Sequence, residues 1–230
     1  MVIVLLPGMD GSGLLFKEFV AELGMRALVV SYPSDRPLGY EQLEAFVQQR
    51  LPVHEPYILL GESFSGPIAI ALAAKGLPGL RAVVLVCTFA RLRPSRAPTF
   101  LHSLFERLPF WRIPVALGAR RLFGPFDGAD VRASLAKALE GVQPAVWRMR
   151  LRCVLNVDVT PQLERIRVPV LYLQAANDRV VPAKASALIE RINPHVRLVN
   201  VDGPHALLQT NPQGCVVALR AFAKACGLEL

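Results

Sequence analysis

The sequence predicts an α/β domain built on a doubly wound, mostly parallel sheet of about six strands. Short runs rich in valine, isoleucine and leucine alternate along most of the chain with segments that carry apolar residues at helical spacing. The runs are apolar almost throughout rather than at every second position, which is typical of strands buried on both faces. With 230 residues, 53% of them hydrophobic, the chain can form one large core. Alternating strands and helices imply right-handed crossovers.

Each element follows from one of these two patterns. Six near-continuous apolar runs are predicted to form the strands, at residues 2–7, 27–33, 57–62, 81–89, 168–177 and 196–203. Five segments with helical spacing are predicted to cover the sheet, at residues 14–24, 40–51, 67–76, 182–192 and 212–226. No internal repeat or low-complexity segment interrupts this order.

One interval, residues 91–159, breaks the alternation. It is punctuated by proline and arginine and has the pattern of several helices, before Thr160 and Pro161 begin a short further helix. The helical candidates within it are residues 99–108, 115–124, 131–140 and 144–155. We interpret the interval as a helical lid inserted after the fourth strand, with residues 1–90 and 160–230 forming the core.

Composition argues against several classes of site and location. The four cysteines, Cys87, Cys153, Cys215 and Cys226, show neither CxxC nor Cys/His spacing, so we expect reduced, structural thiols and no metal. The first apolar run is short and lacks a leading positive charge, and no run is long enough to span a bilayer. A cytoplasmic protein is therefore expected.

Three strand ends carry side chains of the types that nucleophilic catalysis needs. Ser63 in GESFSG follows the third strand, Asp178 in ANDRVVP follows the fifth, and His205 in DGPHALL follows the last. Serine is a weak nucleophile until an imidazole takes its proton, and a carboxylate holds that imidazole in the correct tautomer. The chain order of nucleophile, acid and base is the order found in α/β-hydrolases.

Attack on an ester carbonyl also creates an oxyanion, which needs N–H donors already in place. Phe64, directly after the serine, can supply one backbone N–H at the start of its helix. The glycine-rich loop LPGMDGSG after the first strand can supply the other, with Met9 as the expected donor. The pattern thus predicts a two-donor oxyanion hole.

Nearly the whole chain resembles the serine hydrolases of the α/β-hydrolase superfamily, in particular small bacterial esterases that pair a PGxDG first loop with a GESF elbow. The resemblance implies the same triad and oxyanion hole. The chain departs from the family pattern where Ser65 replaces the second elbow glycine, Pro7 replaces a histidine and Ala175 replaces a glycine. The antiparallel strands that usually precede the first core strand are expected to be missing.

Other residues near these loops allow alternatives. Ser65 is a rival nucleophile, although its side chain should point toward packing, and Asp158 is the alternative acid. Glu62 is expected to be structural, while Asp10 could either brace the first loop or touch substrate. Three further histidines are disfavoured because they lie before strands or in the lid: His54, His102 and His195.

The predicted function is a cofactor-independent carboxylic ester hydrolase that forms an acyl-enzyme and accepts short to medium acyl chains. Thioesterase or acyltransferase activity uses the same residues, and a non-catalytic receptor on the same fold is a further alternative. Apolar residues of the lid are expected to line the acyl pocket: Phe100, Leu104, Phe105, Phe110, Trp111 and Leu122.

The whole formal net charge of +8 comes from residues 91–167, because the remainder of the chain is balanced. An arginine-rich, solvated lid surface is the simple interpretation. The alternative is recruitment of an anionic substrate or an acidic acyl carrier. Nucleic-acid binding is not expected, because no recognition motif accompanies the charge.

Overall fold

The computed structural model describes residues 1–92 and 115–229. Its centre is a sheet of six strands in the order β2-β1-β3-β4-β5-β6, and every neighbouring pair is parallel. The strands are β1 (Val2–Leu6), β2 (Ala27–Val29), β3 (Tyr57–Glu62), β4 (Leu80–Val86), β5 (Val170–Ala175) and β6 (Val196–Val201). The predicted fold class is confirmed.

The strand order reverses between β1 and β3, which are neighbours inside the sheet. From β1 the chain adds β2 on one side, and from β3 it adds β4, β5 and β6 on the other. Ligands of doubly wound sheets bind in the crevice outside the carboxyl ends of the strands at such a reversal. The loops after β1 and β3 therefore meet at one point.

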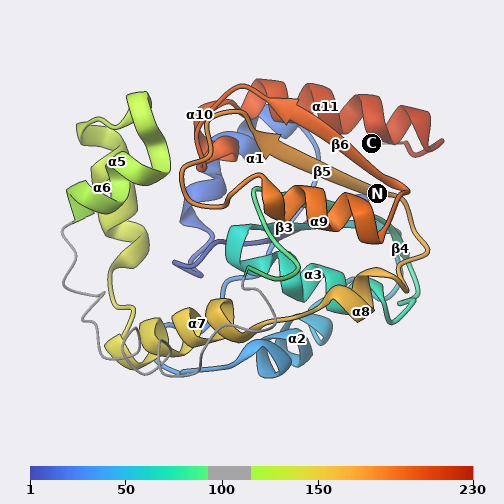
Figure 1. The fold of residues 1–230 in the computed structure, drawn as a ribbon, viewed down its shortest axis with the longest axis horizontal. Coiled ribbons are helices and arrows are strands. Elements are labelled where there is room, and N and C mark those ends of the chain that lie inside the picture. Colours follow the sequence, from blue (N-terminus) through green and yellow to red (C-terminus); the bar gives the residue numbers. More distant parts are fainter. Residues whose placement is uncertain (93–114, 230) are drawn as a thin grey trace.

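Helices cover both faces of the sheet (Figure 1). One face packs against α1 (Lys17–Leu23) and α11 (Pro212–Ala225), and the other against α2 (Tyr40–Gln48), α3 (Gly66–Ala73) and α9 (Lys184–Ile192). Shorter elements complete the core: η1 (Leu14–Phe16), η2 (Ser63–Ser65), α8 (Thr160–Leu163) and α10 (Leu207–Thr210). None of the described helices is long and apolar enough to cross a membrane.

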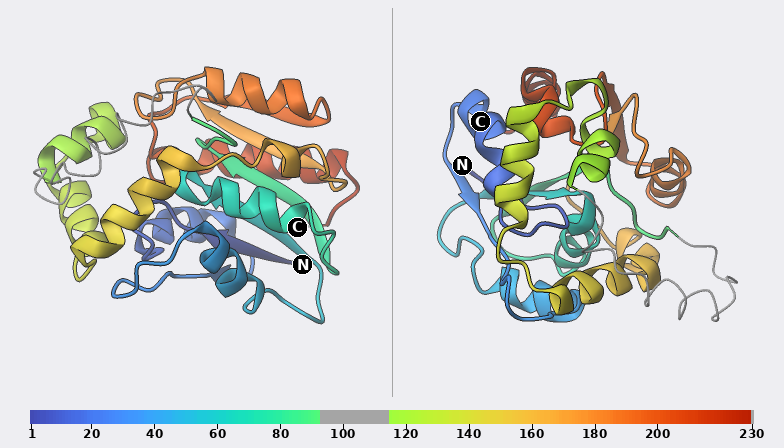
Figure 2. Two further views of the ribbon diagram at one scale, coloured as in Figure 1. Left: turned by 60° about the horizontal axis from the view of Figure 1, so that its bottom comes forward. Right: turned by 90° about the vertical axis from the view of Figure 1, so that its left-hand side faces the viewer.

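Beyond β4, the described part of the insert contains the helices α5 (Val115–Phe123), α6 (Ala129–Leu139) and α7 (Pro144–Asn156) and the 3-10 turn η4 (Gly124–Phe126). α5 and α6 lie beyond the carboxyl ends of the strands, and α7 runs back along the side of the core that carries α2 (Figures 1 and 2). The candidate helix at residues 99–108 lies outside the described residues. The division into core and lid stays a prediction.

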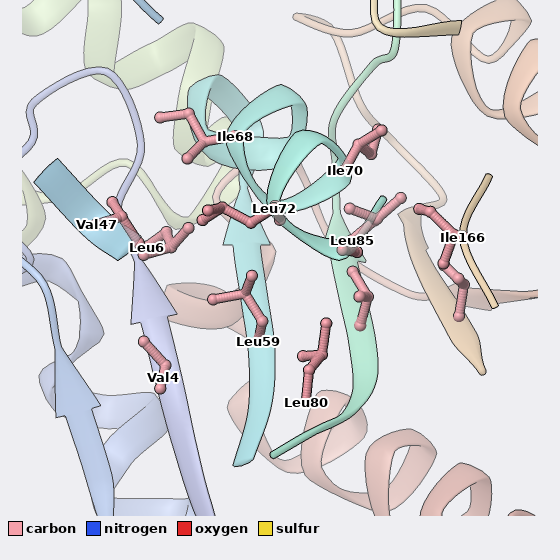
Figure 3. Close-up of a cluster of buried hydrophobic side chains, with 14 of the residues drawn as sticks. Val4, Leu6, Val47, Leu59, Ile68, Ile70, Leu72, Leu80, Leu85 and Ile166 are labelled. Carbon is pink, nitrogen blue, oxygen red and sulfur yellow. The ribbon is translucent and has the colours of Figure 1, made fainter. Parts of the chain in front are cut away.

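The side chains between the sheet and α3 form the larger apolar core (Figure 3). Alternate residues of one strand serve the two faces, so Leu59 packs toward α3 while Ile58 and Leu60 pack toward α1 and α11. α3 is buried on nearly all sides, which explains why its sequence is apolar without a polar stripe. The elbow before α3 is thereby fixed to the centre of the core.

Glu62, the last residue of β3, is a buried carboxyl group next to the elbow. Its exposed fraction is 7%, and it accepts a hydrogen bond from Nε2 of Gln209 at 3.0 Å. The pKa of Glu62 is raised from 4.5 to about 7, because burial and, to a smaller extent, the charge of Asp10 raise it by more than the Gln209 hydrogen bond lowers it. Oε1 of Gln209 is buried without a partner among the described residues, and a protonated Glu62 carries the donor it lacks. The structural role predicted for Glu62 fits this position.

Glu62 should make the protein less stable as the pH rises. A raised folded-state pKa means that the native chain keeps a proton which the unfolded chain releases, so stability present below pH 4.5 is lost as the pH rises through about 7. The difference between these pKa values corresponds to about 3 kcal/mol. Urea unfolding between these pH values should show the fall in the wild type and not in Glu62→Gln.

The exposed Glu41 at the start of α2 offers a matched control, since Glu41→Gln should keep the fall. A lowered pKa, as at Asp178, acts in the opposite direction and only below its usual value of 3.8. An equal fall in Glu62→Gln and in the wild type would show that another group is responsible.

Candidate active site

Ser63 lies at a sharp turn between β3 and the helical residues that lead into α3. Its backbone has a φ of 48°, a left-handed conformation that non-glycine residues seldom adopt. Such a strained strand-to-helix turn exposes a serine hydroxyl at the carboxyl edge of the sheet. The hydroxyl of Thr88, just after β4, donates to the carbonyl of Ser63 and holds the turn from the neighbouring strand.

The structure brings the three predicted triad residues together. Oγ of Ser63 lies 2.9 Å from Nε2 of His205, and Nδ1 of the same ring lies 2.8 Å from Oδ2 of Asp178. The imidazole therefore stands between hydroxyl and carboxylate, although 142 residues separate Ser63 from His205. His205 is 4% exposed, so little water competes for these contacts.

Asp178 is held in the turn after β5 by more than the histidine. Its Oδ1 accepts the amide N–H groups of Val180 at 2.7 Å and Val181 at 2.9 Å, which leaves Oδ2 for His205. Burial raises the pKa of Asp178, but the hydrogen bonds from His205, Val180 and Val181 outweigh it and lower the pKa below its usual value. The carboxyl group is therefore ionised at neutral pH.

The alternative residues lie elsewhere. Oδ1 of Asp158 accepts the backbone N–H and the hydroxyl of Thr160, and its Oδ2 pairs with Arg91 at 2.9 Å, so it stabilises the start of α8. Oδ2 of Asp10 accepts from both the backbone N–H and the hydroxyl of Ser12. Of the two uses left open for Asp10, the structure shows bracing of the first loop.

Ser65 and Tyr32 tie the elbow to the β1 loop. The hydroxyl of Ser65 donates to the carbonyl of Pro7, and the hydroxyl of Tyr32 lies 2.6 Å from Ser65 Oγ. Ser65 is fully buried and points away from the histidine's hydrogen-bond chain, as expected for a packing residue. The serine that departs from the family's glycine is thus a cross-link between two loops, which sequence reasoning missed.

The two expected oxyanion donors come from these same loops. Met9 lies in the β1 loop and Phe64 follows the elbow serine at the first turn of η2. Within the described part of the chain, neither backbone N–H donates to a protein acceptor. Tyr40 of α2 fixes the position of Phe64 by two contacts. Its hydroxyl donates to the Phe64 carbonyl at 2.9 Å, and the two rings stack with their centroids 4.9 Å apart.

Cys87 is an unexpected neighbour of the triad. Its Sγ, the Asp178 carboxylate and a His205 ring nitrogen lie within 4.8 Å of one another, close enough for a shared metal ion. Burial first, and then the nearby Asp178 charge, raise the pKa of the Cys87 thiol well above its usual value. Because metals bind the thiolate, this environment disfavours a metal site. Cys87 also has a φ of 47° and ends β4 earlier than predicted.

The insert meets the site through α5. The backbone N–H of Ala206, next to His205, donates to the carbonyl of Leu122 at 2.9 Å, and Leu122 is partly buried against Ala119 and Phe123. Leu122 is the one predicted pocket residue that the structure describes, and its pocket role stays a prediction. The others lie outside the described residues: Phe100, Leu104, Phe105, Phe110 and Trp111.

The insert's arginines are not all solvated, which corrects the simple interpretation of its charge. Arg132 is exposed and pairs with Asp127 at 2.8 Å, as expected of a surface arginine. Arg150 is 2% exposed, and its guanidinium contacts the β1 loop. The sequence offered no signal that would separate Arg150 from the neighbouring arginines.

Comparison with known proteins agrees with this geometry. The chain is 30% identical, over 96% of its length, to the polyketide synthase ThaQ of Burkholderia thailandensis, but spans 12% of that protein. It is 26% identical, over 69% of its length, to the pimeloyl-[acyl-carrier protein] methyl ester esterase of Nitrosomonas europaea, and spans 67% of it. The fold of bromoperoxidase from Bacillus anthracis matches with a TM-score of 0.81 at 19% identity, covering 97% of this chain and 91% of that one.

A family comparison covers most of the core and the insert together. Residues 3–218 match the alpha/beta hydrolase family, a span that contains Ser63, Asp178 and His205. The similarity to bromoperoxidase concerns the fold alone, whereas the family match covers the sequence itself. The chain belongs to the alpha/beta hydrolase family.

Proposed function

We propose that the protein is a serine carboxylesterase that cleaves short to medium acyl esters through an acyl-enzyme. One observation carries this proposal: the continuous hydrogen-bond chain from Ser63 through His205 to Asp178, with distances of 2.9 and 2.8 Å. The name of the Nitrosomonas europaea relative, a methyl ester esterase, supports the same reaction class. Nucleophile, base and acid are the proposed roles.

Acylation follows from the tautomer that the structure favours. Asp178 accepts the Nδ1 proton of His205, so the lone pair of Nε2 faces the Ser63 hydroxyl and can take its proton as Oγ attacks the ester carbonyl. The backbone N–H groups of Met9 and Phe64 would stabilise the oxyanion. His205 then returns the proton to the departing alcohol, and the serine carries the acyl group.

Deacylation repeats these steps with water as the nucleophile. His205 takes a proton from water as the water oxygen attacks the acyl carbonyl. The tetrahedral intermediate then collapses by breaking the bond to Oγ of Ser63, and His205 gives its proton to Oγ, which restores the serine hydroxyl and releases the carboxylic acid. With a thiol as the leaving group in place of the alcohol, the reaction would be thioester hydrolysis. With an alcohol or thiol as the acceptor in place of water, it would be acyl transfer, so thioesterase and acyltransferase activity are chemically close alternatives. A panel of acyl esters and thioesters of increasing length would separate them.

Ser63→Ala should abolish turnover of p-nitrophenyl butyrate, with a loss of about a millionfold, because the nucleophile is removed. Wild-type protein should gain one fluorophosphonate adduct by mass spectrometry, located on Ser63. Ser65→Ala is the matched control, and loss of its buried hydrogen bonds should cost at most about a hundredfold. A chain that gains no adduct would instead be a non-catalytic receptor, and an adduct on Ser65 would reassign the nucleophile.

Asp178→Asn should lower kcat by about ten-thousandfold through the wrong histidine tautomer. The amides of Val180 and Val181 should keep the Asn oxygen, which turns the Asn amino group toward Nδ1 of His205. The ring proton would then sit on Nε2, facing Ser63. Asp158→Asn should leave kcat unchanged, since the hydrogen bonds of the Asp158 carboxylate within residues 1–92 and 115–229 go to Thr160 and Arg91 and not to His205. The opposite ranking of the two variants would move the acid to Asp158.

A second candidate substrate is an ester carried by an acidic acyl carrier. The observation that favours it is the confinement of the whole net charge of +8 to residues 91–167. The Nitrosomonas europaea relative is named for a substrate linked to an acyl-carrier protein. Complementary charge steers a partner during diffusion and raises the association rate.

Recruitment by charge should make kcat/KM for a carrier-linked ester fall steeply with salt, while a small neutral ester should barely respond. The informative range runs from about 0.01 M to about 0.1 M salt, where the Debye length shrinks from about 30 Å to about 10 Å. Stopped-flow or steady-state rates for the two esters would be compared at matched ionic strength. Equal salt dependence would leave a general small-molecule esterase as the better description.

A further inference from the structure

Arg150, in the middle of α7, is the largest side chain among those that the described residues bury almost completely. It belongs to the insert, and arginine usually keeps its guanidinium in water. Burying a charged group is costly unless hydrogen bonds replace the water that it loses. A guanidinium that is 2% exposed must therefore be held by well-placed acceptors.

Three hydrogen bonds to described residues hold this guanidinium, and all three acceptors are backbone carbonyls. Nη1 donates to the carbonyls of Met9 at 2.8 Å and Asp10 at 2.7 Å, and Nη2 donates to that of Pro33 at 3.1 Å. A Cβ on Gly11 would lie 2.6 Å from Nη2, so glycine leaves the room that the guanidinium needs. The arginine fits into the β1 loop rather than lying on it.

Two hydrogen bonds, one of them from Arg150, hold the two peptide units that flank Met9. The carbonyl of Gly8 accepts the N–H of Gly11 at 3.1 Å, and the carbonyl of Met9 accepts Nη1 of Arg150. A trans peptide unit is planar, and its N–H points opposite to its C=O. Holding the Gly8 carbonyl therefore sets the direction of the Met9 N–H, and holding the Met9 carbonyl prevents the residue from turning.

We propose that Arg150 is a positioning residue that keeps the Met9 N–H oriented to receive the oxyanion. The inference rests on the proposed function, because it assigns a task within the same reaction. Oxyanion donors act by being oriented before the charge develops, and loss of one donor lowers kcat by about a hundred- to a thousandfold. Without Arg150 the Met9 N–H is still present, but the Met9 carbonyl loses the hydrogen bond that fixes its orientation. The value of kcat should therefore fall by about ten- to a hundredfold.

Arg150→Met keeps the length of the side chain and removes all three hydrogen bonds. For p-nitrophenyl butyrate, kcat should fall as stated while KM changes little, because the oxyanion forms only in the transition state. The Ki of a matching trifluoromethyl ketone, which mimics the oxyanion, should rise in proportion to the loss of kcat/KM. Arg132→Met is the matched control, since Arg132 is also an insert arginine but contacts Asp127 at the surface.

Rescue separates positioning from a merely structural role. Arg150→Ala should regain kcat in millimolar guanidinium chloride, and urea at the same concentration should not restore it. Arg150→Lys keeps the charge but cannot reach all three carbonyls, so its kcat should lie between those of the wild type and Arg150→Met. If Arg150→Met does not fold, the Lys variant decides the question in the same assay.

The proposal is overturned if a folded Arg150→Met, or a folded Arg150→Lys where Met does not fold, keeps the wild-type kcat and ketone affinity. It is also overturned if only KM changes, because that result would place Arg150 in substrate binding. The activity of the wild type shows which hypothesis fails. If the wild type hydrolyses the ester and the Arg150 variants keep its kcat and ketone affinity, the positioning role alone is rejected. A wild type with no turnover and no fluorophosphonate adduct rejects the esterase proposal, and the positioning role with it.

Discussion

The pairing of β1 with β3 in the interior of the sheet is the constraint on which the site depends. Parallel registry from Val2 with Tyr57 to Leu6 with Gly61 brings both strands to their carboxyl ends at the same level. The glycine-rich loop and the serine elbow therefore leave the sheet side by side. A shift of two residues would move one loop by about 7 Å relative to the other, which is larger than any hydrogen bond that joins them.

Around this pair of loops, polar side chains donate the hydrogen bonds that backbone N–H groups donate within helices and sheets. Irregular backbone at the sheet edge has carbonyl groups that no ladder satisfies, and buried carbonyls need donors. Four side chains supply the donors: Ser65 to Pro7, Tyr40 to Phe64, Thr88 to Ser63, and Arg150 to Met9 and Asp10. Each bond fixes the orientation of a loop peptide, so loop geometry depends on distant parts of the chain.

The sequence predicted the sheet and the triad for the same reason. A buried parallel strand is apolar along its length, and a reactive side chain directly after such a strand lies at a known edge of the sheet. Ser63, Asp178 and His205 could therefore be placed before their distances were known. Strand ends were less predictable: β4 stops at Val86 because Cys87 turns to a left-handed conformation, which an apolar pattern does not reveal.

The supporting residues could not be predicted, because their partners are backbone atoms far away in sequence. Arg150 and Asp10 are 140 residues apart. Every residue has a backbone carbonyl, so the sequence does not show which carbonyl accepts a hydrogen bond. Ser65 looked like a small substitute for glycine, yet its hydroxyl is what connects the elbow to Pro7. A pattern of residue types indicates which residues are buried and which side chains are reactive. It does not indicate which side chain hydrogen-bonds to which backbone carbonyl.

The insert therefore helps to hold the loops at the carboxyl edge of the sheet, where the proposed catalytic residues lie. α7 contributes the guanidinium that enters the β1 loop, and α5 contributes the carbonyl that accepts the N–H beside His205. Both contacts join the insert to backbone within one or two residues of a proposed catalytic group. A change in the insert's packing, whether by mutation or by a bound substrate, would thus act on the oxyanion loop and the histidine loop together. On the proposed function, sequence changes in the insert would therefore alter turnover through these two loops.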